Sequence, residues 1–281
     1  MNVRQIVDRV DTLPTLPDVV IQLNQFLKDS SIDIESIANI IEKDAALSSK
    51  VLLLANSSYY GLSSKVDSIF RSIIVLGFNT VCKVIMTASV YQMFNTQSKR
   101  SGVDFGGMWL HTLGCAVASK VVMAKNNEME SEKAFMCGIL HDIGKVAISG
   151  ALPLEQEKIL TLQKDSGMPL VDAEREVLGT DHAEVGYGIS KKWNFPDYMC
   201  EVIRCHHQPS VSKTAALFAS AVHIGNSIAK ALALGKSTEP RVTTIDLNAW
   251  ALLDIAESDI FPIVDTVQNE FDLAMDCWTP E

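Results

Sequence analysis

The hydrophobic positions of this chain recur at the three- and four-residue spacing of amphipathic α-helices in almost every segment. Asp33 and Asp44 each precede such a segment and are suited to cap a helix, because a carboxylate accepts hydrogen bonds from free backbone N–H groups. The apolar positions after the two caps are Ile34, Ile37, Ile40 and Ile41, and then Leu47, Val51 and Leu54. Strand-like alternation is scarce along the chain. The pattern therefore predicts an all-α protein.

Helix-period segments continue through the rest of the sequence. Ile69, Ile73 and Leu76 recur at i, i+4 and i+7, and Gly77 is predicted to end that helix in a left-handed conformation. Further helices are predicted at residues 81–94, 111–125, 132–140, 170–178 and 218–234. The segment 56–61 between two of the predicted helices is expected to be a loop.

Polar and helix-breaking stretches divide the chain into three predicted parts. The polar segment 97–102 is suited to a connection, so residues 1–100 are expected to form an amino-terminal helical lobe. Residues 101–234 contain every histidine and are expected to form a second helical lobe. The stretch 235–240 breaks the helix. Residues 235–281 should then pack back on the body, because Trp250 and its neighbours are too apolar for a free tail.

The most specific chemistry lies in residues 138–145, where His141 and Asp142 stand side by side in an apolar setting. Imidazole and carboxylate ligands together suit a divalent ion such as Zn, Fe, Mn or Ni. Two such ions can generate hydroxide and clamp a phosphoryl group, and Asp142 is the candidate to bridge them. Lys145 projects from the same side of the helix and could neutralise a phosphate oxygen. The remaining histidines are His111, His182, His206, His207 and His223.

Each candidate ligand has a structural alternative. His141 and Asp142 could be satisfied by internal hydrogen bonds, and His206 and His207 could end a helix whose dipole favours positive charge. We favour ligation for these four residues.

Two histidines are undecided. His111 could be a core histidine with a backbone partner, and His182 could begin a helix capped by Asp181 or Thr180. His223 is assigned a structural role, and Lys145 would be a surface lysine without an ion nearby.

The order of His111, His141-Asp142, His182 and His206-His207 resembles the HD superfamily of metal-dependent phosphohydrolases. It is most similar to the HD-GYP branch, whose members hydrolyse cyclic di-GMP. Residues 208–212 after the His-His pair contain no Gly-Tyr-Pro loop. Asn226 stands where the superfamily's closing aspartate is expected. A neutral carboxamide coordinates weakly, so the second ion would lose a charged ligand.

The amino-terminal half resembles the HDOD family, the HD-related output domain of bacterial signalling proteins. The resemblance is carried by residues 13–17, 40–47, 52–61 and 68–77, and it extends from about Val10 to about Ala233. It implies a two-lobed all-α protein, with an HD-like lobe at 101–234, that acts through protein partners. It also implies a partly retained site for one or two divalent ions at His111, His141, Asp142, His182, His206 and His207. The alternative is a phosphohydrolase of a nucleotide or phosphoester, in which Asp142 and Lys145 act on a small phosphorylated ligand.

Composition and charge bear on the predicted partners and location of the protein. A net charge of −10, from 34 acidic and 24 basic residues, argues against broad nucleic-acid binding. The chain reaches charged residues too soon for a signal peptide, and we expect that no uninterrupted apolar segment reaches the length needed to span a bilayer. The six cysteines show no CxxC pairing and are expected to be reduced and packed. These features predict a soluble cytoplasmic protein without a membrane partner.

Overall fold

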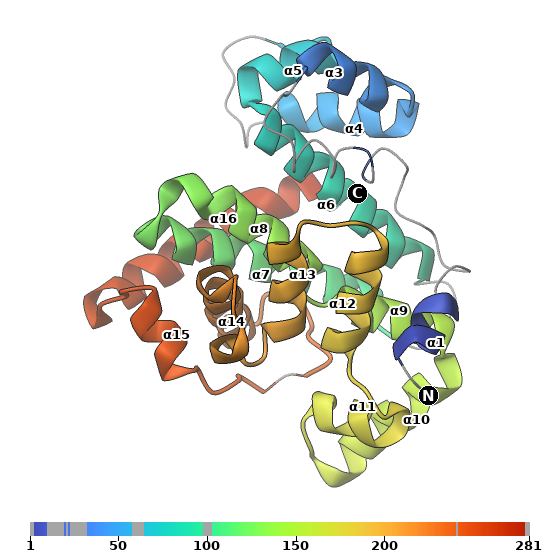
Figure 1. Cartoon of the computed structure of the whole chain (residues 1–281). Coiled ribbons are helices and arrows are strands. Elements are labelled where there is room, and N and C mark those ends of the chain that lie inside the picture. Colours follow the sequence, from blue (N-terminus) through green and yellow to red (C-terminus); the bar gives the residue numbers. More distant parts are fainter. Residues whose placement is uncertain are drawn as a thin grey trace.

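A computed structural model describes residues 3–9, 20, 22, 33–57, 65–97, 103–239 and 241–278. This part of the chain is built of α-helices and short 3-10 turns and contains no strand, so the all-α prediction is confirmed (Figure 1). The α-helices are α1 (Val3–Arg9), α3 (Ile34–Glu42), α4 (Ala45–Ala55), α5 (Ile69–Leu76), α6 (Phe78–Gln97), α7 (Phe105–Asn126), α8 (Ser131–Leu140), α9 (Ile143–Ala151), α10 (Pro153–Ser166), α11 (Leu170–Leu178), α12 (His182–Lys192), α13 (Asp197–Cys205), α14 (Ala216–Ala231), α15 (Leu247–Leu252) and α16 (Ile260–Trp278). The 3-10 turns are η2 (Glu128–Glu130), η3 (Pro209–Val211) and η4 (Glu257–Asp259).

Helix α7 is the central element, and it packs against α6, α8, α14 and α16 (Figure 1). Glycines allow two of these neighbours to approach closely. A Cβ added at Gly138 of α8 would lie 2.6 Å from the Cα of Ala116, and one at Gly225 of α14 would lie 2.7 Å from the backbone nitrogen of Ser119. These contacts bring the backbones of α8 and α14 directly against α7.

Helix α7 is long and apolar enough to cross a bilayer by length and composition, so our expectation that no segment reaches this length was wrong. Two bent helix pairs pass the same test only when each pair is counted as one span. The side chains of α7 are largely buried inside the protein, and a helix that is apolar all round is typical of a protein core. The packing of α7 is that of a buried core helix.

The predicted capping residues of the amino-terminal helices are confirmed. The carboxylate of Asp33 accepts hydrogen bonds from two backbone N–H groups of the first turn of α3. The Oδ1 atom of Asp44 accepts one from the backbone of Leu47 at 3.0 Å. Gly77 ends α5 at φ 82° and ψ 154°, so the positive φ is as predicted but the left-handed helical conformation is not. Its N–H still donates to Ile73 O at 2.9 Å, which satisfies one terminal carbonyl.

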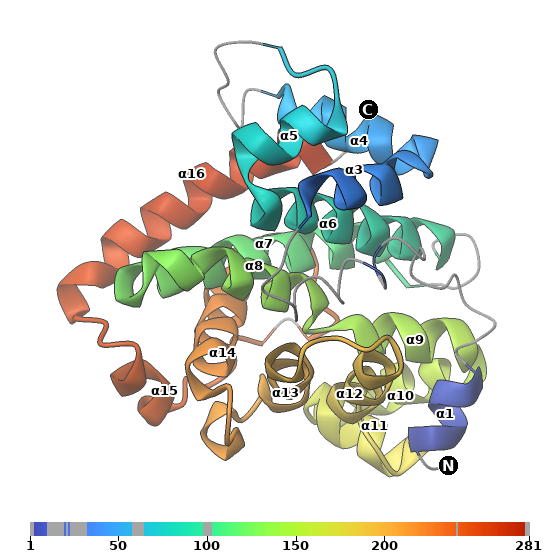
Figure 2. The same cartoon turned by 45° about the horizontal axis from the view of Figure 1, so that its top comes forward.

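The two ends of the described chain pack on different parts of the molecule. Helix α1 lies against α9 and α12, away from α3, α4 and α5 (Figures 1 and 2). Helix α16 packs along α7, and near its end the ammonium of Lys50 lies 5.5 Å from the ring of Trp278. The lobe boundaries near residues 100 and 234 stay predictions, and the expected connection at 98–102 lies outside the described residues. So do most of the predicted loop, at 58–61, and the 13–17 segment.

A charged network links α6 to the helices around α7. Lys83 of α6 is buried, and its ammonium lies 2.6 Å from the Oε2 atom of Glu132 on α8. Lys120 of α7 lies 4.0 Å from the same carboxylate and 2.9 Å from Glu270 of α16. Four helices from distant parts of the chain therefore share one set of ion pairs.

Candidate metal centre

His141 and Asp142 form the two-residue junction between α8 and α9. Gly144, two residues further, explains why this junction lies against α12. A Cβ at that position would collide with the carbonyl oxygen of His182, the first residue of α12. The absence of a side chain at residue 144 thus lets the His-Asp pair approach His182.

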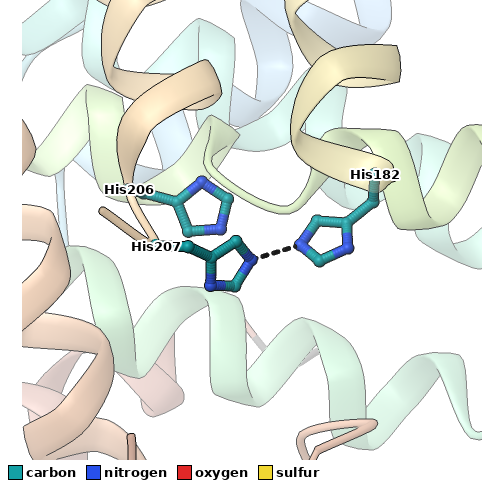
Figure 3. A group of neighbouring side chains, drawn as sticks. All are labelled: His182, His206 and His207. Atoms are coloured by element: carbon teal, nitrogen blue, oxygen red, sulfur yellow. Dashed lines mark hydrogen bonds between the residues drawn. The ribbon is translucent and has the colours of Figure 1, made fainter. Parts of the chain in front are cut away.

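The structure brings all six predicted ligands together from four places in the fold. His111 lies within α7, His182 begins α12, and His206 and His207 follow the end of α13. The candidate ligand atoms form two groups, and within each group they lie within 4.8 Å of one another. The members of the first group are His111, His141 and Asp142, and those of the second are His182, His206 and His207. Figure 3 shows the second group, in which three imidazoles from two helix ends face a common space.

Asp142 lies between the two groups. Its Oδ2 atom is 3.2 Å from Nε2 of His141, and its Oδ1 atom is 3.4 Å from Nε2 of His182 and 3.7 Å from Nε2 of His206. One carboxylate oxygen therefore faces each group. This is the arrangement expected of a carboxylate that bridges two ions.

Three of the histidines are oriented by hydrogen bonds at Nδ1. His141 donates to the carbonyl of Gly138 at 2.7 Å, and His206 donates to the carbonyl of Ile203 at 2.8 Å. His182 donates to Oε2 of Glu174 at 2.6 Å, and the same oxygen accepts the backbone N–H of His182 at 2.9 Å. Each Nε2 atom is left to face the centre. Such outer hydrogen bonds commonly fix the tautomer and the ring orientation of metal-binding histidines.

Several of the centre's polar atoms are buried without a hydrogen-bond partner. They are Nε2 of His111, His141 and His206 and Oδ1 of Asp142. Burying a polar atom without a partner is unfavourable, and such orphans in a folded protein call for an explanation. Lone pairs from His111, His206 and Asp142, and from His141 once it has lost its Nε2 proton, fit a divalent ion of borderline hardness. The residues present therefore fit the metal that the sequence predicts.

The second group contains a direct contact between imidazoles. Nε2 of His207 lies 2.8 Å from Nε2 of His182 (Figure 3). Because Nδ1 of His182 carries the proton donated to Glu174, the proton between the two rings belongs to His207. For both Nε2 atoms to be available to a divalent ion, His207 would have to carry its ring proton on Nδ1 instead.

Burial and neighbouring charges shift the pKa values of the centre's side chains in different directions. Burial lowers the pKa of His111 to about 3, and burial together with the surrounding imidazoles lowers the pKa values of His206 and His207 well below the ordinary value. Burial also acts to lower the pKa of His141, but the adjacent Asp142 carboxylate outweighs it and raises that pKa to about 10. For Asp142, burial is outweighed by His141 and Lys145, so its pKa lies well below the usual range. At neutral pH the centre contains neutral imidazoles beside an imidazolium–carboxylate pair.

Two lysines complete the charge distribution. The ammonium of Lys145 is buried and donates to Oδ2 of Asp142 at 2.7 Å, so Lys145 is not a surface lysine. The side chain of Lys230 on α14 is also nearly inaccessible, and its ammonium donates to Oγ1 of Thr243 at 3.1 Å. Burial lowers the pKa of Lys230, and the charge of Lys145 lowers it further. Asn226 lies one turn before Lys230 on α14 and is itself buried, with Oδ1 unpartnered.

His223 lies beside the centre and uses both ring nitrogens for backbone contacts. Nδ1 donates to the carbonyl of His206 at 2.9 Å, and Nε2 accepts the N–H of Asp246 at 3.1 Å. This is the structural role expected from the sequence. It ties the end of α13 to the segment before α15.

Two residues of the centre were not identified from the sequence, Glu174 and Lys230. Glu174 carried a usable signal, because it occupies the buried stripe of α11 between Ala173 and Leu178, where a carboxylate needs a partner. No feature of the sequence marked Lys230 as part of the centre, since a lysine near a helix end is usually exposed.

Comparison with known proteins gives a family and a set of similar folds. The HDOD domain family matches residues 13–209, more than half of the chain. An uncharacterized protein of Treponema pallidum is 23% identical over 205 residues, which are 72% of this chain and 39% of that protein. The chain thus spans about two fifths of the length of the curated relative it matches.

Solved structures resemble this chain over nearly its whole length. An HDOD domain protein of unknown function from Geobacter sulfurreducens has a TM-score of 0.78 and 24% identity, covering 95% of this chain and 96% of that one. A candidate phosphohydrolase from Shewanella amazonensis has a TM-score of 0.75 and 24% identity, covering 97% and 96%. A candidate signal transduction protein from Marinobacter aquaeolei has a TM-score of 0.76 and 17% identity, covering 95% of this chain and 59% of that one. At these identities the likeness is one of fold.

Proposed function

This chain belongs to the HDOD domain family, and on that premise we propose that it is a bacterial signalling protein acting in the cytoplasm through protein partners. In this proposal its histidine centre holds one or two divalent ions of Fe, Mn, Zn or Ni. The ion acts as a structural staple whose presence sets the conformation that a partner recognises.

The burial of five of the six candidate ligands is the observation that carries this proposal, His207 being partly exposed. The exposed fraction is 3% for His111 and 4% for Asp142, and it is zero for His141, His182 and His206. Structural metal sites are closed by protein ligands, whereas catalytic sites keep a coordination position open. An ion enclosed here would tie α7 and the α8–α9 junction to α12 and the end of α13.

The separation into two groups supports a second ion. The group of His182, His206 and His207 offers three nitrogen ligands without any contribution from residue 226. Asn226 therefore removes a charged ligand from the superfamily pattern without leaving either group short of three candidate donors.

Metal analysis combined with partner binding tests the proposal. Protein purified without chelators and without a His-tag should contain bound transition metal, and chelation should lower its melting temperature. Immobilised wild-type protein should capture partners from the source cell in a pattern that changes on chelation. Asp142→Ala should reproduce the chelated pattern, whereas Glu176→Gln, an exposed change on α11, should not. If the wild-type, chelated, Asp142→Ala and Glu176→Gln proteins all capture the same partners, the proposed structural role of the ion is contradicted.

A second function is favoured by one observation, a cavity of about 920 Å³ that reaches His207, the most accessible of the six candidate ligands. In a phosphohydrolase the divalent ion would polarise a phosphoryl oxygen of a nucleotide or phosphoester. Asp142 would hold the ion, and Lys145 would turn from Asp142 toward the phosphate. Metal-dependent hydrolysis of bis(p-nitrophenyl) phosphate or a nucleotide, abolished by Asp142→Ala, would establish this function. Turnover no faster than buffer with each metal would exclude it for these substrates.

A further inference from the structure

The carboxyl-terminal helices enclose a second cavity, apart from the histidine centre. Its walls come from α7, α14, α15, the start of α16 and the segment 242–245, and its volume is about 240 Å³. Figures 1 and 2 show α15 on the side of the molecule opposite α1. Except for Val122 of α7, every described residue of the lining lies after residue 209, where the match to the HDOD family ends. The family resemblance therefore does not account for this cavity.

The wall of the cavity is apolar throughout. Its accessible surface comes from apolar atoms, and none of the described residues in the lining is charged. The one hydroxyl of this lining belongs to Ser227 and donates to the carbonyl of His223 at 3.1 Å. An ordered water needs several polar partners, so water is held weakly here and hydrocarbon fits better.

The cavity is open to solvent on one part of its wall and closed on another. Val242 and Ile260 line it with 54% and 38% of their surface exposed, whereas Ile224 and Ile263 are almost fully buried. A molecule can therefore enter without unfolding of the surrounding helices. Because apolar surface is unfavourable in water, each methylene that enters should tighten binding about fourfold.

The size of the cavity favours a small molecule over a partner helix. An α-helix with its side chains is about 10 Å wide, and a stable protein interface buries about 800 Å² on each partner. In another protein, an apolar cavity of about 150 Å³ binds benzene, which has six carbons. At the same volume per carbon, the 240 Å³ found here would hold about eight to ten carbons.

Charges around the cavity disfavour an anionic ligand. Helix α14 ends at Ala231, which lines the cavity together with the next residue, Leu232, so the negative end of the helix dipole lies at the wall. Residues 242–281 include acidic side chains but no Lys, Arg or His. The α7 cations Lys120 and Lys125 are already paired with carboxylates of α16 and η4. A carboxylate at the mouth would therefore bind less well than a neutral group.

We propose that this cavity binds the hydrocarbon part of an uncharged aliphatic molecule of about eight to ten carbons. The site is additional to the proposed function and needs no ion in the histidine centre. A bound molecule would contact the segment that begins with Val242. In that segment Thr243 accepts a hydrogen bond from Lys230, and the N–H of Asp246 donates to His223. Occupancy of the cavity would thus stabilise a segment that is bonded to α14.

Calorimetric titration of the full chain tests the inference with three probes, hexan-1-ol, octan-1-ol and sodium octanoate. Two variants fill the cavity from its partly accessible wall, Ala231→Phe on α14 and Val264→Phe on α16. The matched control is Ala45→Phe, a change at an exposed alanine of α4 that does not line the cavity. Circular dichroism verifies that each variant is folded, and either filling variant is sufficient for the comparison.

The expected result is saturable binding of one octan-1-ol per chain, about 15-fold tighter than hexan-1-ol, which is two methylenes shorter. Octanoate should bind about two- to fivefold more weakly than octan-1-ol. A filling variant should weaken octan-1-ol binding by at least about tenfold, because a phenyl ring takes up much of the space. Ala45→Phe should bind like the wild type. Absence of saturable binding, or equal affinity in the control and in a folded filling variant, would overturn the inference.

Tryptophan fluorescence locates the ligand. Trp250 lines the cavity, whereas Trp109, Trp193 and Trp278 do not. Bromine quenches indole emission at short range, so 8-bromooctan-1-ol should quench the wild type more strongly than Trp250→Phe. Equal quenching of the two proteins would place the ligand elsewhere and contradict the proposed site. The same titrations of chelated protein should give the same affinity, so a failure of the histidine centre to bind metal would leave this inference standing.

Discussion

Glu174 and His182 are joined by two contacts to one oxygen atom. Oε2 of Glu174 accepts the Nδ1 proton of His182 at 2.6 Å and the backbone N–H of the same residue at 2.9 Å. Both residues are buried, so the carboxylate fixes the first residue of α12 and the tautomer of its ring at once. An acidic residue of α11 thereby determines which nitrogen of His182 faces Asp142.

The first prediction concerns this pair. Glu174→Gln should weaken divalent metal binding by about 10- to 100-fold, because a neutral amide orients the ring less firmly and makes it less basic. Metal titration followed by calorimetry measures the change. Glu176→Gln on the same helix is exposed and should bind metal like the wild type. Equal affinities for Glu174→Gln and Glu176→Gln would show that the carboxylate has no role in the centre.

The second prediction concerns protons released on metal binding. Asp142 raises the pKa of His141 to about 10 against the effect of burial, so His141 is protonated at neutral pH and must lose that proton to bind an ion. Metal binding by the group of His111, His141 and Asp142 should therefore release about one proton per ion near neutral pH. Titrations in buffers of different ionisation enthalpy count this proton. Binding heats that do not depend on the buffer would contradict the assigned state of His141.

The third prediction concerns the acid sensitivity of the metal-free protein. Burial lowers the pKa of His111 to about 3, whereas in the unfolded chain it titrates near its ordinary value. As pH falls from about 6.5 toward 3, the unfolded state gains the proton first, so stability falls by up to about 1.4 kcal/mol per pH unit for this group. His206 and His207 act in the same direction.

Urea denaturation across this pH range measures the slope. His111→Gln should reduce the loss of stability per pH unit, whatever its effect on stability at neutral pH. An unchanged slope would mean that His111 is protonated in the folded protein.

The fourth prediction concerns the ion pair between α6 and α8. Lys83→Met should lower the free energy of unfolding by about 2 kcal/mol, because it leaves the half-buried Glu132 carboxylate with a weaker partner. Lys83→Met combined with Glu132→Gln should be less destabilising than the single change, since no uncompensated charge remains. Both proteins should bind metal like the wild type. Chemical denaturation measures the free energy of unfolding of both variants. A double variant less stable than Lys83→Met would contradict a stabilising ion pair between Lys83 and Glu132.

Much of the fold follows from local sequence signals. The helix predicted at residues 170–178 has these bounds in the structure, since Gly179 ends it at φ 76° in the left-handed conformation. Asp33 and Asp44 cap their helices because capping depends only on neighbouring backbone. For Gly77 the sequence indicated a positive φ but carried no information about ψ, which depends on where the next helix begins.

The candidate ligands of the site could be predicted from adjacent residues, but the residues that contact them through tertiary packing could not. The pairs His141-Asp142 and His206-His207 carry their signal in adjacent residues, and the structure brings them together with His111 and His182. Glu174 and His182 are eight positions apart in the sequence, and Lys230 and Thr243 are thirteen positions apart. Such contacts depend on tertiary packing, which neither hydrophobic periodicity nor a local motif specifies.

The central claim is that the six clustered side chains hold divalent metal. Elemental analysis by mass spectrometry of untagged protein, purified without chelators, tests it most directly. The account predicts about one to two equivalents of transition metal per chain in the wild type and a lower content in Asp142→Ala, in which only the group of His182, His206 and His207 keeps all three candidate ligands. Less than about a tenth of an equivalent in the wild type, even after incubation with Mn²⁺, Ni²⁺ and Zn²⁺, would contradict it.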